Sequence, residues 1–243
     1  FLSGTYNAKN PNMTQNRVQD GTQVVAIDGP AGAGKSSVAR AAAQVLGFSF
    51  LDTGAMYRAA TLRAMRQGVP LDDSEALARC TAAMTYEQQE SDGGTRILLD
   101  GEDVSESIRS PEVTRNIQHL DQIAAVRQHL VALQRDFGLR QPTVAEGRDM
   151  GTVVFPRSRC KIYMDASLEC RVMRRALEME AKGLAVDRDL LLQEMKARDD
   201  SNIARKESPL RPAEDAVLLD TTAMTKEQVI DTIVNLARER LAQ

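Results

Sequence analysis

"GPAGAGKSS" runs from Gly29 to Ser37 and decides the fold class of this 243-residue chain. It fills the pattern GxxxxGK[ST] completely, and a chance match in a chain of this length is roughly one in a hundred. Glycines in such a loop let backbone N–H groups turn toward phosphate oxygens, and the following helix adds positive potential at its N-terminus. Lys35 can reach the β- and γ-phosphates, and the Ser36 hydroxyl can ligate Mg²⁺. The stretch predicts a nucleoside triphosphate site.

The flanking residues supply the context that such a loop requires. A short apolar run at 23–28 predicts a buried strand, and the Ala-rich segment that follows the loop predicts a helix ending at Gly47. Residues 48–54 read as a second strand and residues 55–68 as a second helix. The order strand–helix–strand–helix predicts a parallel sheet covered by helices.

The rest of the chain departs once from this alternation of strands and helices and then returns to it. "SDGG" at 91–94 separates two β-prone runs, which predicts a small antiparallel insertion. Residues 111–138 have helical spacing and predict one or two helices. The later elements are strands at 142–147, 160–166 and 216–222 and helices at 167–182, 187–205 and 225–242. We therefore predict an α/β fold, a doubly wound parallel sheet of the P-loop type with helices on both faces.

Composition excludes several classes of protein. The net charge is −3, so no global basic field indicates a nucleic-acid partner. The three cysteines are scattered, without a CxxC pair, which argues against a zinc site or a disulfide framework and fits a reducing cytoplasm. No apolar run approaches the roughly 20 residues of a membrane span. The polar residues 1–22 predict a disordered leader. Nothing in the sequence indicates an obligate interface between subunits, so we expect a monomer.

Arginines are the second signal. Arg58 and Arg148 follow predicted strands, at the sheet edge where α/β folds bind ligands. Arg198, Asn202 and Arg205 are spaced i, i+4 and i+7, so one helix face is expected to present all three. Guanidinium groups suit several phosphates held close together. Three further arginines fit a ligand role and a solvated surface equally well: Arg171, Arg174 and Arg175.

Missing motifs narrow the chemistry. Neither histidine, His119 or His129, has a nearby Ser or Cys partner pattern, so no acyl-transfer triad is indicated. The HRD and DFG signatures of protein kinases are absent. An acceptor that is itself a phosphate explains the lack of an obvious base, because a phosphate monoester has a second pKa near 6 and is mostly ionised at pH 7. Bringing two polyanions together then requires Mg²⁺ and several arginines.

Seven stretches carry a family resemblance: "IDGPAGAGKSSVA" (27–39), "LDTGAMYRA" (51–59), "DGEDVSESIRSPEV" (100–113), "EGRDMGTVVFP" (146–156), "KIYMDAS" (161–167), "ARDDSNIAR" (197–205) and "DAVLLDTT" (215–222). With them the chain resembles the bacterial cytidylate kinases, which are nucleoside monophosphate kinases, over about residues 23–242. The stretch 146–156 is the most specific. The resemblance implies transfer of the γ-phosphoryl group of ATP to CMP or dCMP, giving ADP and CDP or dCDP.

The same resemblance implies a domain organisation. Residues 23–243 form a single P-loop kinase domain with a core at 23–70, 139–182 and 206–243. An insertion that binds the nucleoside monophosphate spans about 71–138, and a short mobile lid spans about 183–205.

Site residues follow from the loop and the resemblance together. ATP is expected on Gly29, Pro30, Ala31, Gly32, Ala33, Gly34, Lys35, Ser36, Ser37 and Arg174. The resemblance places CMP on Thr53, Tyr57, Arg58, Gln118, Arg127, Arg148, Asp149, Arg198, Asn202 and Arg205. Catalysis is expected of Lys35, Arg148, Asp149 and Arg198. Ser36 is the expected Mg²⁺ ligand, and Asp28 and Glu146 are candidates for acting through its waters.

Two positions depart from the family pattern, and two rival functions stay open. Gln118 stands where members commonly have a small hydroxyl residue, and Asn202 stands where they commonly have Asp. Gln118 keeps hydrogen-bonding capacity toward a base, whereas Asn202 lacks a charge toward a sugar hydroxyl. These changes leave the preference among CMP, dCMP and UMP open. The rivals are a kinase with a hydroxyl acceptor, such as shikimate or gluconate, and a non-catalytic nucleotide sensor.

Overall fold

The computed structural model describes residues 23–91, 94–181 and 183–242. Within these residues the chain divides into two compact units. One unit comprises residues 23–50 together with residues 142 onward, and the other comprises residues 51–141. The expected leader at 1–22 lies outside the described residues.

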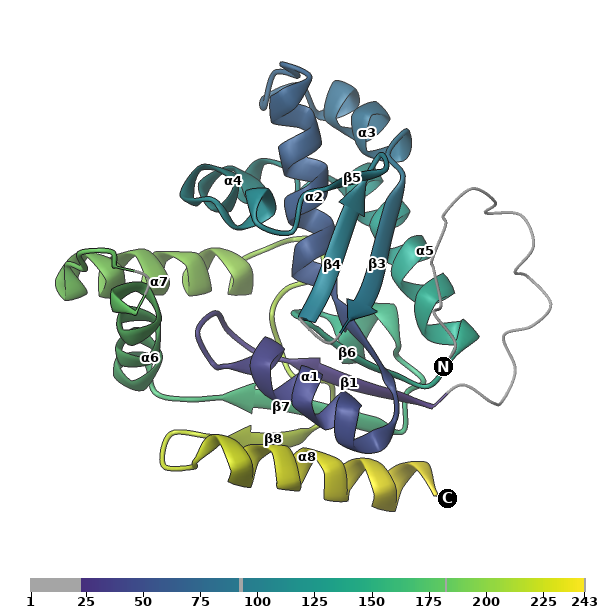
Figure 1. Ribbon diagram of the computed structural model, residues 1–243, viewed down its shortest axis with the longest axis vertical. Helices are drawn as coiled ribbons and strands as arrows, with labels where there is room; N and C mark the ends of the chain where they lie inside the picture. The colour runs from purple at the N-terminus through teal and green to yellow at the C-terminus, as the bar shows by residue number, and fades with distance from the viewer. Residues whose placement is uncertain (1–22, 92–93, 182, 243) are drawn as a thin grey trace. The chain divides into compact units, whose positions relative to one another are not determined.

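A five-stranded sheet organises the first unit, which contains the P-loop (Figure 1). Its strands have the order β2-β6-β1-β7-β8, so the strand before the P-loop lies at the centre. β1 pairs in parallel with β6 and β7, and β7 pairs in parallel with β8. The strands are β1 Val24–Asp28, β2 Ser49–Asp52, β6 Thr143–Gly147, β7 Cys160–Asp165 and β8 Val217–Asp220. The expected α/β fold with a parallel sheet is confirmed.

Two helices of this unit pack together against the sheet. α1 (Lys35–Leu46) and α8 (Lys226–Leu241) lie side by side in Figure 1. Their buried faces share one apolar core with the strands, built from residues that include Val25, Ile27, Val38, Ala42, Phe50, Ile162, Ile233 and Val234. α6 (Leu168–Glu180) and α7 (Arg188–Ile203) form a separate small core from Val172, Ala176, Leu191 and Met195. The core is therefore aliphatic, as a composition with 4% aromatic residues requires.

The second unit joins helices to a small antiparallel sheet in the order β3-β4-β5. The expected antiparallel pairing is confirmed, with β3 running against β4, while residues 92–93 of the expected turn lie outside the described residues. The strands are β3 Tyr86–Ser91, β4 Gly94–Leu99 and β5 Glu102–Asp103. The helices are α2 Thr53–Arg66, α3 Ser74–Ala82, α4 Pro111–Asn116 and α5 Ala124–Arg140, with 3-10 turns at Ser107–Arg109 and Ile117–His119.

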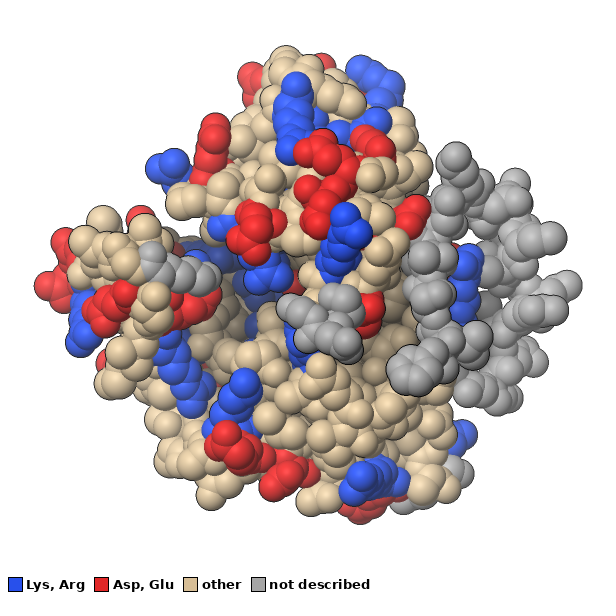
Figure 2. Space-filling model, in the orientation of Figure 1, with Lys and Arg blue, Asp and Glu red and all other residues tan. Residues whose placement is uncertain are grey.

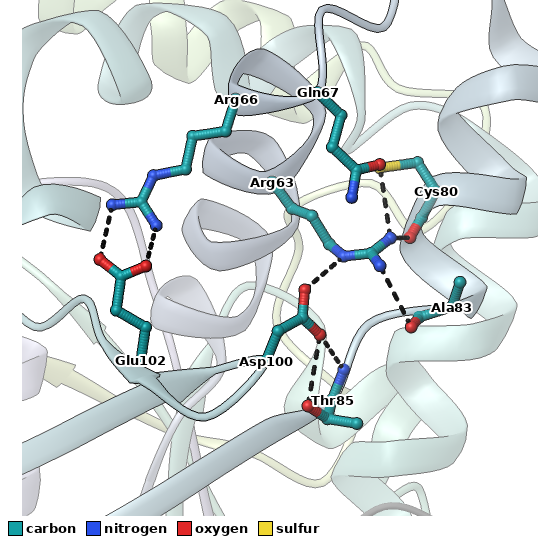
Figure 3. A network of polar contacts seen from close by, with 8 residues as sticks. All are labelled: Arg63, Arg66, Gln67, Cys80, Ala83, Thr85, Asp100 and Glu102. Carbon is teal, nitrogen blue, oxygen red and sulfur yellow. Dashed lines mark hydrogen bonds and ion pairs between the residues drawn. The ribbon is translucent and has the colours of Figure 1, made fainter.

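A polar network fastens this small sheet to the helices (Figure 3). The Arg63 guanidinium on α2 donates to Asp100 Oδ2 at 2.7 Å, to Ala83 O at 3.3 Å and to the carbonyl oxygen of Cys80. Asp100 Oδ1 in turn accepts the backbone N–H of Thr85 at 2.8 Å. One half-buried guanidinium therefore connects α2, α3 and the turn after β4.

The expectation of one or two helices over 111–138 is confirmed, since α4 and α5 form there with a 3-10 turn between them. Two other expectations were incomplete or wrong. Helix α3 was not predicted, although Asp73 supplies its N-cap by accepting from Ala76 N at 2.9 Å. α7 ends at Ile203, so Arg205 lies beyond the helix and the expectation of one helix face bearing Arg198, Asn202 and Arg205 was wrong.

Candidate active site

The P-loop leaves the central strand β1 and enters α1, as the sequence predicts. Gly29 has φ +149, and a Cβ added there would lie 1.9 Å from the carbonyl oxygen of Met164. Gly34 has φ +86 and caps the N-terminus of α1. Both positions therefore require glycine, because an L side chain rarely adopts these backbone angles and at Gly29 has no room.

Lys35 is buried at the start of α1, and its Nζ donates to Pro30 O at 2.7 Å. Burial is the main cause that lowers the pKa of Lys35 to about 8, and the positive charge of Arg148 lowers it further. The carboxylates of Glu146 and Asp28 act in the opposite direction. A polyanion placed next to this ammonium would stabilise its protonated form.

Ser36 and Glu146 bring two oxygen ligands together across the sheet edge. The Ser36 hydroxyl donates to Glu146 Oε1 at 2.8 Å, linking the start of α1 to strand β6. Mg²⁺ prefers oxygen ligands and commonly binds through one or two protein oxygens together with phosphates and waters. This pair therefore fits Mg²⁺, whereas Ser37 Oγ donates to Gly34 O within its own loop at 3.0 Å. No group of three or more His, Cys, Asp or Glu side chains in the described part of the chain forms a metal cluster.

The segment after β6 carries Arg148 and Asp149 beside the P-loop. Arg148 is half-buried and its NH1 donates to the carbonyl oxygen of Gly29 at 3.2 Å. Asp149 is buried and precedes a π-helix at Met150–Val154, an element that the sequence did not predict. Asp28 accepts hydrogen bonds from the backbone of Met150 and Gly151. Burial raises the pKa of Asp28 to about 7 even though these two bonds lower it.

Two arginines on α6 contact the P-loop, and a third does not. Arg171 NH1 donates to Ala31 O at 3.1 Å, and Arg174 NH1 donates to Ala33 O at 3.4 Å. Arg174 also donates to Thr221 O at 2.6 Å, after strand β8. Arg175 pairs with Glu178 at 2.8 Å on the exposed side of the helix. The sequence assigned Arg174 to the ATP site and gave no such role to Arg171 or Arg175, and the structure brings Arg171 and Arg174 to the nucleotide loop.

Arg171 also binds α7, through a carboxylate that sequence reasoning missed. Its NH1 lies 2.6 Å from Asp199 Oδ2, and both side chains are buried. Asp199 is a neighbour of Arg198 in the chain, and no spacing rule distinguished it from the exposed Asp200. This pair links α7 to the helix that contacts the P-loop.

The remaining residues of this unit gather near the end of α7. Arg198 is half-buried, and its charge contributes to lowering the pKa of Lys35. Asn202 is buried, and its Oδ1 accepts from Arg205 NH2. The buried Asn202 Nδ2 has no hydrogen-bond partner among the described residues. Arg205, which lies in the loop after α7, therefore contacts the helix by a hydrogen bond to Asn202 and does not belong to a face of the helix.

The other expected residues belong to the unit 51–141. Thr53 begins α2, and Arg58 on that helix lies 3.6 Å from the carboxylate of Asp52. The Arg127 guanidinium lies over the Tyr57 ring at 5.6 Å from its centroid. Arg127 also donates to Asp121 O at 3.1 Å. Gln118 is exposed in the 3-10 turn before α5.

A complete P-loop at the end of the central strand of a parallel sheet, with arginines at its edge, defines the class of P-loop kinases. A family model described as "Cytidylate kinase" matches residues 25–239. A cytidylate kinase of Syntrophotalea carbinolica is 44% identical over 217 residues, which cover 89% of this chain and 92% of that protein. A cytidylate kinase of Caldanaerobacter subterraneus subsp. tengcongensis is 44% identical over 218 residues, which cover 90% and 96%. The chain belongs to the cytidylate kinase family.

It is accordingly a kinase that phosphorylates CMP with ATP. A solved gluconokinase from Sinorhizobium meliloti 1021 aligns with a TM-score of 0.46 at 16% identity, over 92% of this chain and 97% of that one. A likeness this weak says nothing about the acceptor. The family match removes the rival kinase with a hydroxyl acceptor and the rival nucleotide sensor.

Proposed function

We propose that this chain transfers the γ-phosphoryl group of ATP in line to a phosphate oxygen of CMP or dCMP, with Mg²⁺ as cofactor. The observation that carries the residue assignment is the contact set around the P-loop: buried Lys35, the Ser36–Glu146 pair and the Arg148–Gly29 bond. These groups supply positive charge and oxygen ligands at one place, as phosphoryl transfer requires.

The donor half of the site is the P-loop. Backbone N–H groups of Gly32, Ala33 and Gly34 would cradle the phosphates, and Lys35 would approach the β- and γ-phosphates. Ser36 would hold Mg²⁺ with Glu146 beside it, and the ion supplies charge neutralisation of the phosphate oxygens when bound. Arg174, which already contacts Ala33 and Thr221, would flank the bound nucleotide.

The acceptor half would use several arginines. Arg58, Arg148 and Asp149 would orient the CMP phosphate, whose oxygen is ionised near neutral pH and needs no protein base. Gln118, Arg127 and Arg205 would contact the cytosine, and Arg198 and Asn202 would contact the sugar. Thr53 and Tyr57 would complete this pocket. Arg198 would also face the transferring group, where a guanidinium stabilises developing charge.

Domain roles follow as part of the proposal. Residues 71–138 would act as the insertion that binds the monophosphate, and residues 183–205 as a lid that excludes water during transfer. The core would comprise 23–70, 139–182 and 206–243.

We further propose that the enzyme acts as a cytoplasmic monomer, with neither nucleic acid nor membrane as partner. All three cysteines are free, which supports a reducing compartment. Acidic and basic side chains are interspersed on the face drawn in Figure 2, which supports the absence of a nucleic-acid partner. Among the described residues, no helix has the length and apolar character needed to cross a bilayer.

The test is an acceptor panel of CMP, dCMP, UMP, AMP and dTMP with ATP and Mg²⁺, followed by coupled detection of ADP. The two cytidine nucleotides are expected to give the highest kcat/KM values, and a reaction without acceptor measures background ATP hydrolysis. The assignment would be wrong if AMP or dTMP exceeded both cytidine nucleotides. Omission of Mg²⁺ is expected to abolish turnover with every acceptor.

A further inference from the structure

Asp28 is a buried carboxylate at the end of the central strand. It is the last residue of β1, and it lies in register with Gly147 of β6 and Tyr163 of β7. Only 3% of the residue is exposed. A buried carboxylate is costly unless its oxygens accept hydrogen bonds, so its partners indicate its role.

Both oxygens of Asp28 accept backbone N–H groups from the start of the π-helix Met150–Val154. Oδ1 accepts from Met150 N at 2.7 Å, and Oδ2 accepts from Gly151 N at 2.8 Å. The first N–H groups of a helix have no partner inside that helix and need one from elsewhere. Asp28 therefore caps, from a different strand, the element that directly follows Arg148 and Asp149.

A third bond joins the same two segments. Arg148 NH1 donates to the carbonyl oxygen of Gly29, the residue after Asp28. The contact does not depend on glycine at position 151, because an added Cβ would lie at an ordinary 3.4 Å from Asp28 Oδ2. These contacts fasten the segment with the acceptor arginine to the first residues of the P-loop.

We infer that Asp28 is a positioning residue that holds Arg148 and Asp149 beside the P-loop, so that the acceptor phosphate is bound in line with the donor. The inference rests on the proposed function, in which these two residues orient CMP. It replaces the role expected of Asp28 from the sequence, which was to act through waters of Mg²⁺. The carboxylate that adjoins the Ser36 hydroxyl is Glu146, whereas Asp28 binds backbone.

The decisive measurement is CMP binding in the absence of metal and ATP. Asp28→Asn keeps the size of the side chain but turns an NH₂ donor toward a backbone N–H. Calorimetric titration of CMP in EDTA is expected to show a Kd about tenfold above wild type, which corresponds to the loss of one charge-assisted hydrogen bond. A role through Mg²⁺ alone would leave this Kd unchanged, and that result would overturn the inference.

Lys161→Met is the matched control. Lys161 Nζ binds Pro156 O at 2.6 Å and Asp215 at 2.8 Å, so it anchors the other end of the same loop. Its Kd for CMP is expected to stay within about twofold of wild type, because this anchor is farther along the chain from Arg148. If Lys161→Met weakened CMP as much as Asp28→Asn, general loosening of the loop would be the cause and the inference would fail.

A second variant covers the case in which Asp28→Asn does not fold. Asp28→Ser is smaller, and its hydroxyl oxygen can accept only one of the two backbone N–H groups in place of the carboxylate, so it is expected to raise the Kd for CMP in EDTA severalfold. Wild-type affinity in this variant would contradict the inference. If the wild-type chain itself failed to bind CMP, the proposed function would fall first, and the two failures are therefore distinguishable.

Discussion

At the scale of single residues, Lys35 combines burial with proximity to a second positive charge, Arg148. The two causes lower the pKa of Lys35 to about 8 in the nucleotide-free chain. Bound triphosphate adds several negative charges next to the ammonium and raises its pKa again. ATP binding and protonation of Lys35 are therefore linked.

We predict that ATP binding takes up a proton at pH 8.5, because Lys35 is mostly neutral before binding and charged after it. Uptake is expected to be roughly half a proton or more, and close to zero at pH 6.5, where Lys35 is already charged. Calorimetry in two buffers with different ionisation enthalpies measures this number. Lys35→Met is expected to abolish the uptake, and equal uptake in that variant would contradict the prediction.

At the scale of elements, helix α7 is attached to α6 by a small apolar core and by one buried ion pair, whose arginine also contacts the P-loop. Arg171 donates to Asp199, to Ala31 O and to Ala166 O. A buried ion pair usually adds no more stability than apolar residues of the same volume would. Removing only one of its partners is nevertheless strongly destabilising, because the other charge stays buried without a counter-ion.

We expect Asp199→Ala to lower the free energy of unfolding by about 3–5 kcal/mol, because Arg171 stays buried without its carboxylate. Glu178→Ala is the matched control, since it removes the exposed ion pair with Arg175 on the same helix and should cost less than about 1 kcal/mol. Urea unfolding of both variants gives the comparison. Equal losses would show that the Arg171–Asp199 pair does not hold the two helices together.

The small sheet of the second unit offers a parallel comparison on one helix, α2 (Figure 3). The Arg63 side chain is 14% exposed and joins several partners, whereas the Arg66 side chain is 41% exposed and pairs with Glu102 at 2.9 Å. Burial and multiple bonds should make Arg63 the stronger contributor.

Arg63→Met is expected to reduce the free energy of unfolding by about 2 kcal/mol, and Arg66→Met by less than about 1 kcal/mol. The same urea titration measures both. A larger loss for Arg66→Met would mean that the exposed pair with Glu102, and not the Arg63 network, fastens the sheet to α2.

At the scale of the whole molecule, the P-loop residues all fall in one compact unit, whereas the expected CMP residues are divided between the two units. All P-loop residues belong to the unit built on 23–50 and 142 onward, whereas Thr53, Tyr57, Arg58, Gln118 and Arg127 belong to the unit 51–141. Each nucleotide should therefore leave its own pattern of protection along the chain.

Hydrogen exchange followed by mass spectrometry should resolve these patterns. ATP with Mg²⁺ is expected to slow exchange in residues 29–37, and CMP is expected to slow it in residues 53–58 and 118–127. CMP should also protect residues 147–151, because Arg148 and Asp149 lie there. Protection by CMP confined to the P-loop would contradict the assignment of residues 53–58 and 118–127 to the CMP site.

Much of the fold could be predicted because it depends on local patterns. The apolar run before Gly29, the Ala-rich helix after it and the β-prone runs near residue 91 each specify an element from nearest neighbours alone. Helix α3 was missed because only a single cap residue, Asp73, marks a nine-residue helix. The π-helix after Asp149 was missed because its cap comes from another strand.

The sequence by itself determined the class of the protein, the P-loop and the residue types that phosphoryl transfer needs, because these are properties of short contiguous stretches. Only the tertiary structure decided which charged groups act together. It showed that Asp28 binds backbone while Glu146 adjoins Ser36, and that Arg171 and Arg174, but not Arg175, reach the P-loop. The physical reason is that burial, hydrogen bonding and pKa depend on residues far apart in the chain, which meet only when the strands are aligned.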